Sequence, residues 1–230
     1  MSKKIDCKEA AMLIPAGASI MVGGFMGCGN PHGIISELAA LGTSGLTLIS
    51  NDASMLNGPD GSEYYGIAKL IHNRQVKKLI ATHVGLNPEV AEQMNCGTLE
   101  VELIPQGSFA EMIRAGGSGL GGVLTPTGIG TIVEKAPHVH SIIEIDDKKY
   151  LLECPLKADF ALLCAYKADE AGNAWYKGTT RNFSTVMAMA ANTVIVEAEN
   201  LVPTGEIEPE NIVTPGILVD YIAKGMQAHG

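Results

Sequence analysis

Short, unbroken runs of apolar residues that stop at glycine or at polar side chains constrain the fold of this chain most. Ala18–Val22 stops at Gly23, and Leu46–Ser50 stops at the polar residues Asn51 and Asp52. Apolarity that is continuous rather than alternating is typical of strands buried on both faces, as in a parallel sheet. Parallel strands need crossover connections, so we expect helices between these runs.

Segments with helical periodicity separate the apolar runs. Pro31 begins one such segment and Gly42 ends it. Further strands are expected at 78–82, 99–104, 160–165 and 193–196, and further helices at 67–73, 88–94, 108–115, 183–191 and 216–224. The strand at 99–104 alternates apolar and charged residues, which indicates an edge position. We therefore predict an α/β fold: a single domain over residues 1–230 with an open, mostly parallel, Rossmann-like sheet flanked by helices.

Two segments depart from this alternation. Gly116–Gly130 holds seven glycines in fifteen residues, and we predict that it is irregular. Val139–Leu152 is predicted to be a small β-hairpin, with Asp146 and Asp147 near its turn.

Composition and charge exclude several classes of protein. Lys and Arg total 16 against 25 Asp and Glu, a net charge of -9, which argues against binding to nucleic acid or to an anionic membrane. The five cysteines include no C-x-x-C pair, so neither a disulfide framework nor a zinc site is supported. We expect no signal peptide, find no apolar stretch of transmembrane length, and expect a cytoplasmic protein.

Familiar catalytic and nucleotide-binding motifs also give no assignment. Gly117, Gly119 and Gly122 fit G-x-G-x-x-G, but Pro126 and more glycine follow where a helix would have to begin. No P-loop and no G-x-S-x-G elbow occurs. We interpret His138-x-His140 as a surface pair at the start of a strand and expect no metal.

Polar groups follow several of the predicted strands directly. The glycine loop after Val22, Asn51 and Gln106 all stand at such positions. The carboxyl ends of parallel strands meet at one edge of a sheet, where ligands bind, so these residues are expected to converge. Side-chain amides are neutral donors that suit a carbonyl oxygen, although they could equally cap helices or satisfy loops.

The segment from Gly17 to Pro31 also has a recognisable spacing: three apolar residues, Gly-Gly-Phe, three variable residues and Gly-x-Pro. It resembles the signature of the class I coenzyme A (CoA) transferases, although Ala16 stands where that family usually has Asp or Asn. Further matches extend the resemblance over nearly the whole chain, at 49–52, 101–107, 114–130, 169–173 and 194–199. Within the family, the chain is most similar to alpha subunits of two-subunit 3-oxoacid transferases of the acetate/butyrate–acetoacetate type.

The resemblance implies a ping-pong transfer of CoA between an acyl-CoA and a short-chain carboxylic or 3-oxo acid. In the family a glutamate in a Ser-Glu-Asn-Gly motif of the beta subunit becomes a glutamyl-CoA thioester. That motif does not occur in this chain, and we assign no nucleophile to Glu63, Glu102, Glu111 or Glu153. The chain alone is therefore expected to be inactive and to need a beta subunit, as in a heterotetramer of two alpha and two beta subunits. CoA is a substrate, and no permanently bound cofactor is expected.

The family's site residues carry over onto matching positions here. Gln106 matches an amide that stabilises the thioester oxyanion, and Asn51 matches a position close to the acyl group. The loop associated with CoA corresponds to Gly24, Phe25, Met26, Gly27, Cys28, Gly29 and Asn30, where missing side chains would let backbone amides approach the ligand.

Two other classes of function stay open. Sugar-phosphate isomerases and deaminases have a related sheet and act as single chains, but they need an acid–base residue that we do not find here. A noncatalytic ligand-binding subunit is the other alternative. The preferred donor and acceptor acids are not fixed by the sequence, because one methylene of substrate is worth only about 1–3 kcal/mol.

Overall fold

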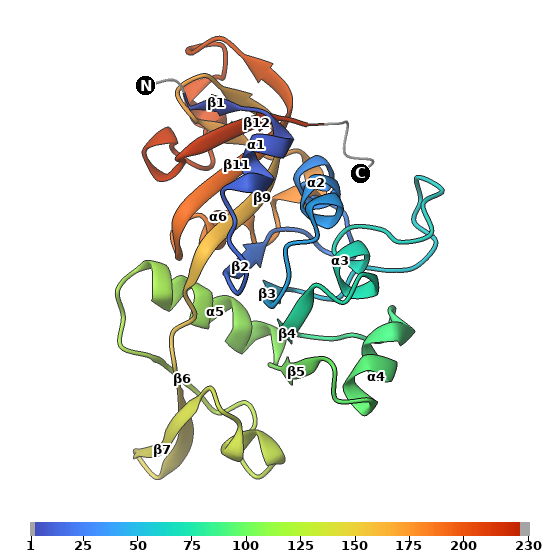
Figure 1. Cartoon of the computed structure of the whole chain (residues 1–230). Coiled ribbons are helices and arrows are strands. Elements are labelled where there is room, and N and C mark those ends of the chain that lie inside the picture. Colours follow the sequence, from blue (N-terminus) through green and yellow to red (C-terminus); the bar gives the residue numbers. More distant parts are fainter. Residues whose placement is uncertain (1–2, 226–230) are drawn as a thin grey trace.

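The computed structural model describes residues 3–225 and confirms the predicted mostly parallel sheet flanked by helices (Figure 1). The strands of the main sheet are β1 (Lys4–Ile5), β2 (Ser19–Val22), β3 (Leu46–Ser50), β4 (Val76–Ala81), β5 (Glu100–Leu103), β9 (Ala158–Asp169), β10 (Ala174–Trp175), β11 (Ala191–Val202) and β12 (Tyr221–Lys224). Their order is β1-β12-β11-β9-β2-β3-β4-β5, with β10 paired antiparallel to β9. The alternating strand β5 lies at the edge, as predicted.

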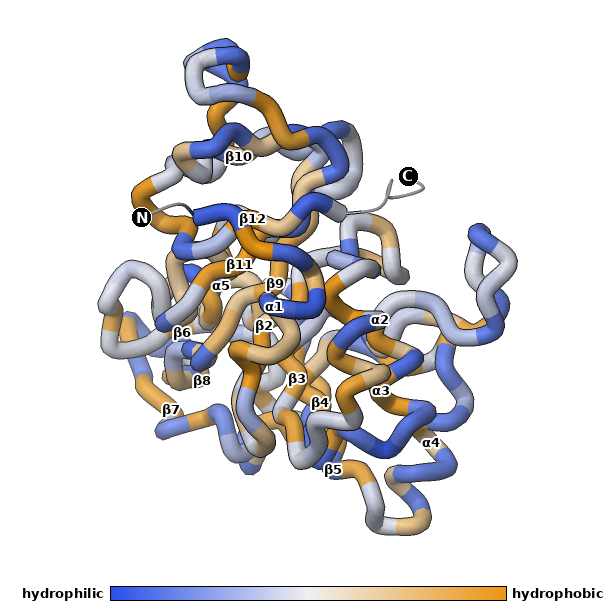
Figure 2. The backbone as a smooth tube through the Cα atoms, turned by 45° about the horizontal axis from the view of Figure 1, so that its top comes forward, coloured by the Kyte–Doolittle hydropathy of each residue, from blue (hydrophilic) through white to orange (hydrophobic). Residues whose placement is uncertain are grey.

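Helices cover both faces of this sheet, because successive residues of a buried strand point to opposite sides. The helices are α1 (Cys7–Met12), α2 (His32–Leu41), α3 (Ala68–His72), α4 (Pro88–Asn95), α5 (Gln106–Gly117) and α6 (Ser184–Met187). Ile20 and Val22 pack with α2 and α3 in one core cluster, whereas Met21 packs with α5 and α6 in the other. Figure 2 shows the hydrophobic strands running between these layers.

A carboxylate from a distant strand holds the start of α2. Pro31 precedes this helix and offers no side-chain cap. Glu197 of β11 accepts hydrogen bonds from the backbone N–H groups of Gly33 at 3.0 Å and Ile34 at 2.8 Å. A negative charge at a helix N-terminus is stabilising, so Glu197 fixes the helix that follows the glycine loop.

The predicted hairpin is present and belongs to a separate three-stranded sheet. Its strands are β6 (Val123–Thr125), β7 (Val139–Ile145) and β8 (Lys148–Glu153), in the order β6-β8-β7. Asp146 and Asp147 both have positive φ, at 50° and 61°, as a tight two-residue turn requires. The prediction of an irregular 116–130 segment is partly wrong, because α5 runs to Gly117 and β6 lies within the segment.

The predicted last helix is wrong. Pro215 and Gly216 begin only a single 3-10 turn (Gly216–Leu218), and Tyr221–Lys224 is the strand β12, which pairs in parallel with both β11 and β1. Burial of Ile222 and Ala223 in the sheet accounts for the difference. The strands at 160–165 and 193–196 are longer than predicted, because β9 and β11 pair with each other along their length, and α6 is shorter than predicted.

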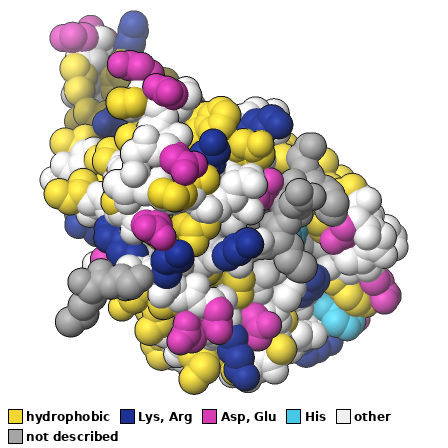
Figure 3. All heavy atoms as spheres, turned by 90° about the horizontal axis from the view of Figure 1, so that it is seen from above, with side chains coloured by type: hydrophobic (Ala, Val, Ile, Leu, Met, Phe, Trp, Pro, Cys, Tyr) yellow, Lys and Arg dark blue, Asp and Glu magenta, His cyan; other side chains and the backbone are white. Residues whose placement is uncertain are grey.

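The single domain predicted over 1–230 includes residues 1–2 and 226–230, which lie outside the described residues. In the part that is described, no helix has the length and apolarity needed to cross a membrane. Figure 3 shows acidic and basic side chains interspersed on one face of the molecule.

Candidate functional site

The carboxyl ends of β2, β3, β4 and β5 lie side by side, so the residues that follow these strands share one edge of the sheet. The predicted convergence of Asn51 and Gln106 is confirmed, because Gln106 Nε2 donates to Asn51 Oδ1 at 2.7 Å. Thr82, which follows β4 between them, donates its hydroxyl to Asn51 Oδ1 at 3.2 Å. Three consecutive strand ends therefore build one polar cluster.

The two amides have different exposure. Asn51 is completely buried, and its Nδ2 donates to Asp52 Oδ2 at 2.8 Å. Gln106 is exposed at the first turn of α5, and its Oε1 has no hydrogen-bond partner among the described residues. One amide N–H of Gln106 is thus fixed by a buried neighbour, and the other is available to an external oxygen. In this chain Asn51 lies behind Gln106 and supports it.

Asp52 connects these amides to the glycine loop. Besides Asn51, its Oδ2 accepts from the backbone N–H of Met26 at 2.7 Å, and its Oδ1 accepts from the backbone N–H of Ser54 at 2.7 Å. Met26 has a positive φ of 53°, which its bonded N–H helps to hold. The loop and the amide pair are therefore parts of one hydrogen-bonded unit.

Hydrogen bonds within the loop and to Asn182 hold the loop Gly24–Asn30 closed. Phe25 and Cys28 exchange backbone hydrogen bonds of 3.0 and 2.9 Å, and the Gly24 N–H donates to Asn182 Oδ1 at 3.0 Å. The backbone amides of Gly24, Phe25, Met26 and Cys28 are thus already occupied. At Gly24 (φ 124°) a Cβ would meet Asn30, and at Gly27 (φ 83°) it would meet the Tyr65 ring. Packing inside the chain, rather than approach of a ligand, accounts for these two glycines.

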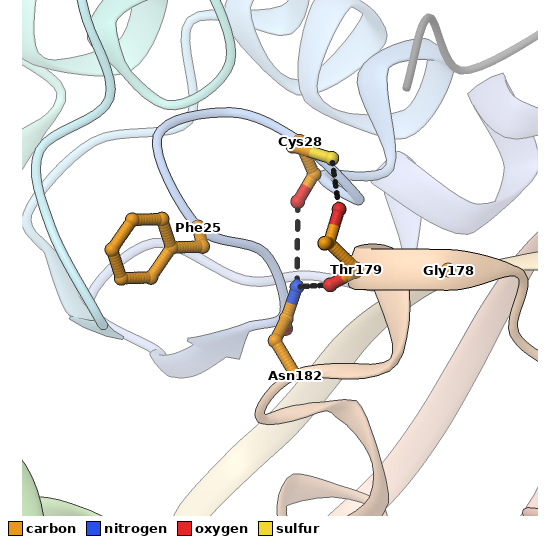
Figure 4. Close-up of a pocket in the computed structure, with 5 residues that line it drawn as sticks. All are labelled: Phe25, Cys28, Gly178, Thr179 and Asn182. Carbon is orange, nitrogen blue, oxygen red and sulfur yellow. Dashed lines mark hydrogen bonds between the residues drawn. The ribbon is translucent and has the colours of Figure 1, made fainter.

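A pocket of about 510 Å³ opens between this loop and a distant segment (Figure 4). Its lining residues are Phe25, Cys28, Gly178, Thr179 and Asn182. Asn182 Nδ2 donates to the carbonyl oxygens of Thr179 at 3.0 Å and Cys28 at 3.4 Å, and Cys28 Sγ lies 3.4 Å from Thr179 Oγ1. In Figure 4 the Phe25 ring lies apart from this bonded group. The volume suits a small organic ligand or part of a larger one.

The far wall of this pocket, 178–182, is absent from the predicted site. These residues lie about 150 positions along the chain from the loop that they contact, with a separation of 154 for Asn182 and Cys28. Only the run of glycine and polar residues between two predicted elements marked the segment as a loop. No local pattern indicates which loop such a segment will meet.

The interpretation of the histidine pair as a surface feature is wrong for His138 and right for His140. His138 is buried and its Nδ1 lies 2.8 Å from Glu102 Oε1, whereas His140 is exposed. Hydrogen bonding to His138, followed by Lys78, lowers the pKa of Glu102 to about 2. Glu153 is buried nearby, and burial raises its pKa. Among the described residues no group of three or more His, Cys, Asp or Glu side chains has a metal-binding arrangement.

Comparison with known proteins assigns residues 4–225 to a family model described as "Coenzyme A transferase". The chain is 51% identical over 223 residues to the acetoacetyl-CoA:acetate/butyrate CoA transferase alpha subunit of Clostridium acetobutylicum, covering 97% of this chain and 98% of that protein. It is 44% identical over 221 residues to the acetate CoA-transferase alpha subunit of Escherichia coli K12, covering 96% of each.

Among solved structures, the chain resembles an acyl-CoA transferase of Escherichia coli O157:H7, described as a thioester complex with CoA. The TM-score is 0.84 at 22% identity, which supports the same fold. The alignment covers 100% of this chain and 49% of that protein, so the present chain spans about half of that longer chain.

Proposed function

Because the chain belongs to the coenzyme A transferase family, we propose that it is the alpha subunit of a two-subunit enzyme that moves CoA between an acyl-CoA and a short-chain carboxylic or 3-oxo acid. The donor and acceptor class is that of acetate, butyrate and acetoacetate. Two related alpha subunits, at 51% and 44% identity over nearly their full lengths, support this assignment. We further propose a cytoplasmic location, an assembly of two alpha and two beta subunits, and no permanently bound cofactor.

The reaction proposed is nucleophilic and proceeds in two halves. The carboxylate of a beta-subunit glutamate attacks the thioester carbonyl and expels CoA thiolate, which leaves a mixed anhydride. The thiolate then attacks the glutamyl carbonyl and releases the first acid, which leaves a glutamyl-CoA thioester. The carboxylate of the second acid reverses these steps and leaves as the new acyl-CoA.

The contribution of this chain is the oxyanion donor. The observation that carries the proposal is the exposed Gln106 amide, held at 2.7 Å by the buried Asn51 at the carboxyl edge of the sheet. When the thioester carbonyl is attacked, negative charge develops on its oxygen, and a preorganised N–H stabilises that charge. Asn51 and Asp52 hold Gln106 and the glycine loop in register, so no reorganisation is needed during the step.

The pocket beside Phe25 and Cys28 is proposed to receive part of CoA. Its apolar and hydroxyl lining suits the uncharged portion of CoA. Arg181 is exposed on the 178–182 segment, and the exposed Lys177, whose Nζ lies 4.8 Å from the centre of the Tyr166 ring, precedes it; we propose that these two cations attract the phosphate groups. The net charge of -9 makes such local cations more important for an anionic substrate.

The direct test is reconstitution of activity from separate subunits. We expect transfer of CoA from acetoacetyl-CoA to acetate only when this chain and its beta subunit are mixed. Transferase activity of the isolated chain would contradict the division of the site. Sugar-phosphate isomerase activity of the isolated chain would favour the single-chain alternative, and ligand binding without turnover in the mixture would favour a noncatalytic subunit.

A further inference from the structure

A buried group of polar side chains joins the three-stranded sheet to the main sheet, and the proposed chemistry does not use it. It consists of Glu102 on β5, Ser108 on α5, His138 immediately before β7, and Glu153 on β8. The side chain of His138 is 3% exposed, that of Glu102 11% and that of Glu153 0%. In Figure 1 the small sheet lies next to α5 and β5, the elements that carry the first two residues.

His138 stands between two carboxylates. Its Nδ1 is 2.8 Å from Glu102 Oε1, and its Nε2 is 3.9 Å from Glu153 Oε1. Among the described residues, His138 Nε2, both carboxyl oxygens of Glu153 and Ser108 Oγ lack a hydrogen-bond partner. Ser108 nevertheless lies close enough to Glu153 to lower its pKa, against the larger effect of burial. Buried polar atoms without partners are rare, and their concentration here calls for an explanation.

Charge balance indicates how many protons the group carries. Glu102 is ionised, because His138 and Lys78 of β4 both stabilise its carboxylate. Lys78 also contacts the exposed Glu100. With one proton on either His138 Nε2 or Glu153, the negative charge left on the group is matched by Lys78. Without that proton, the group would bury a second negative charge that no cation compensates, which costs considerable free energy.

The location of the group ties it to the candidate site. Glu102 precedes and Ser108 follows the β5–α5 junction at 103–107, which carries Gln106. Glu102 contacts His138, which immediately precedes β7, and Ser108 lies near Glu153 of β8. The backbone of His138 is fixed as well, because its carbonyl accepts from the Cys154 N–H at 2.7 Å.

We propose that the buried His138–Glu153 pair carries one proton, on one or the other residue, and that this pair fastens the three-stranded sheet to the β5–α5 junction that presents Gln106. His138 is then a positioning residue for that amide. This positioning role rests on the proposed function, whereas the fastening does not.

The expected pH dependence has a definite sign. Burial raises the pKa of Glu153 in the folded chain, so its contribution to stability is complete at low pH and is lost as pH rises through that pKa. Glu102 has the opposite pH dependence. Because its pKa is lowered, its contribution to stability is lost only as pH falls into the acid range. The contact between the two sheets is therefore expected to weaken as pH rises and Glu153 loses its proton.

Hydrogen exchange followed by mass spectrometry tests the fastening on the full chain, purified with any partner subunit. Between pH 5 and 9, after correction for intrinsic rates, we expect wild-type protection in 123–153 and 100–110 to fall with rising pH. His138→Asn should increase exchange in both regions about tenfold or more at pH 5. His140→Asn, the exposed matched control, should leave exchange within about twofold of the wild type.

Glu153→Gln supplies a conservative second variant, because its amide carries a permanent N–H in place of the proton of the pair. It should retain wild-type protection at pH 5 and remove the loss of protection at higher pH, whereas the exposed control Glu144→Gln should retain that loss. Wild-type protection that does not change with pH, or the same loss of protection in Glu153→Gln, would overturn the proposal. So would equal effects of His138→Asn and His140→Asn.

Turnover of the assembled enzyme tests the positioning role separately. His138→Asn should lower kcat with KM nearly unchanged and make kcat fall at lower pH than in the wild type. An unaltered kcat and pH profile, with exchange increased, would remove the positioning role and leave the fastening. If the preparation has no transferase activity, the proposed function fails, while the exchange result still decides the fastening.

Discussion

The side-chain amide of Gln106 donates one N–H to Asn51 and leaves the other toward solvent, at the start of a helix and at the edge of the sheet. A donor held in this way loses little freedom when a substrate oxygen arrives, which is the condition for effective stabilisation of an oxyanion. The sequence predicted both amides and their convergence, because each follows a strand directly. It did not predict that Asn51 would be buried behind Gln106, since the hydrogen bond from Thr82 comes from the end of the neighbouring strand and leaves no local pattern.

Removal of this amide should affect the transition state more than substrate binding. We expect Gln106→Ala to lower kcat of the assembled enzyme by a factor on the order of 10²–10³, with a small change in KM. Steady-state kinetics with acetoacetyl-CoA and acetate measures both. Gly107→Ala is the matched control, because a Cβ there meets nothing within 4 Å and the amide remains. Near-normal turnover of Gln106→Ala would refute the role of this residue.

The close packing of Gly27 against Tyr65 can be tested separately from the strain of its positive φ. Gly27→Ala places a Cβ against Tyr65 at a positive φ of 83°, whereas Gly17→Ala has a similar φ of 80° and meets nothing within 4 Å. We expect the free energy of unfolding to fall by about 1–2 kcal/mol in Gly17→Ala from strain alone, and by about 2–4 kcal/mol in Gly27→Ala from strain and overpacking. Urea unfolding measures the difference, and equal losses in the two variants would show that Tyr65 does not constrain the loop.

At the scale of elements, continuous apolar runs predicted the central strands β2, β3 and β4 well, because burial on both faces leaves a clear pattern. The same reasoning predicted the wrong element, a helix, for the 216–224 segment. Its short apolar run fits a helix as well as a strand, and it becomes β12 because β11 and β1 offer free edges on both sides. Such pairing joins residues nearly the whole chain apart, as in Lys4 with Ile222, and no local window contains it.

The contact between β5 and the small sheet should contribute a measurable acid sensitivity. The pKa of Glu102 is lowered from its ordinary value of 4.5 to about 2, so its stabilising effect is complete above about pH 5 and disappears as pH falls toward 2. We expect Glu102→Gln to reduce the free energy of unfolding by about 1–3 kcal/mol at pH 7. Urea unfolding from pH 7 to 2.5 should show this difference shrinking in acid. A difference that is constant with pH, or equal to that of the exposed control Glu144→Gln, would contradict the assignment.

At the scale of the whole molecule, the sheet presents one carboxyl edge on which a loop, an amide pair and a pocket meet, and we assign no nucleophile to the glutamates at 63, 102, 111 and 153. Glu63 and Glu111 are exposed, and Glu102 and Glu153 are engaged with His138 between the two sheets. The sequence could predict the near side of the site, which follows the strands. It could not predict the wall at 178–182, because only the complete fold brings that segment to Cys28.

The division of the active site between two chains is the central claim, and trapping the covalent intermediate tests it most directly. The assembled enzyme would be incubated with an acyl-CoA, quenched, digested and examined by mass spectrometry for a CoA thioester. We predict that the adduct lies on a beta-subunit glutamate and on no peptide of this chain. A CoA thioester on any glutamate of this chain would contradict this division of the site.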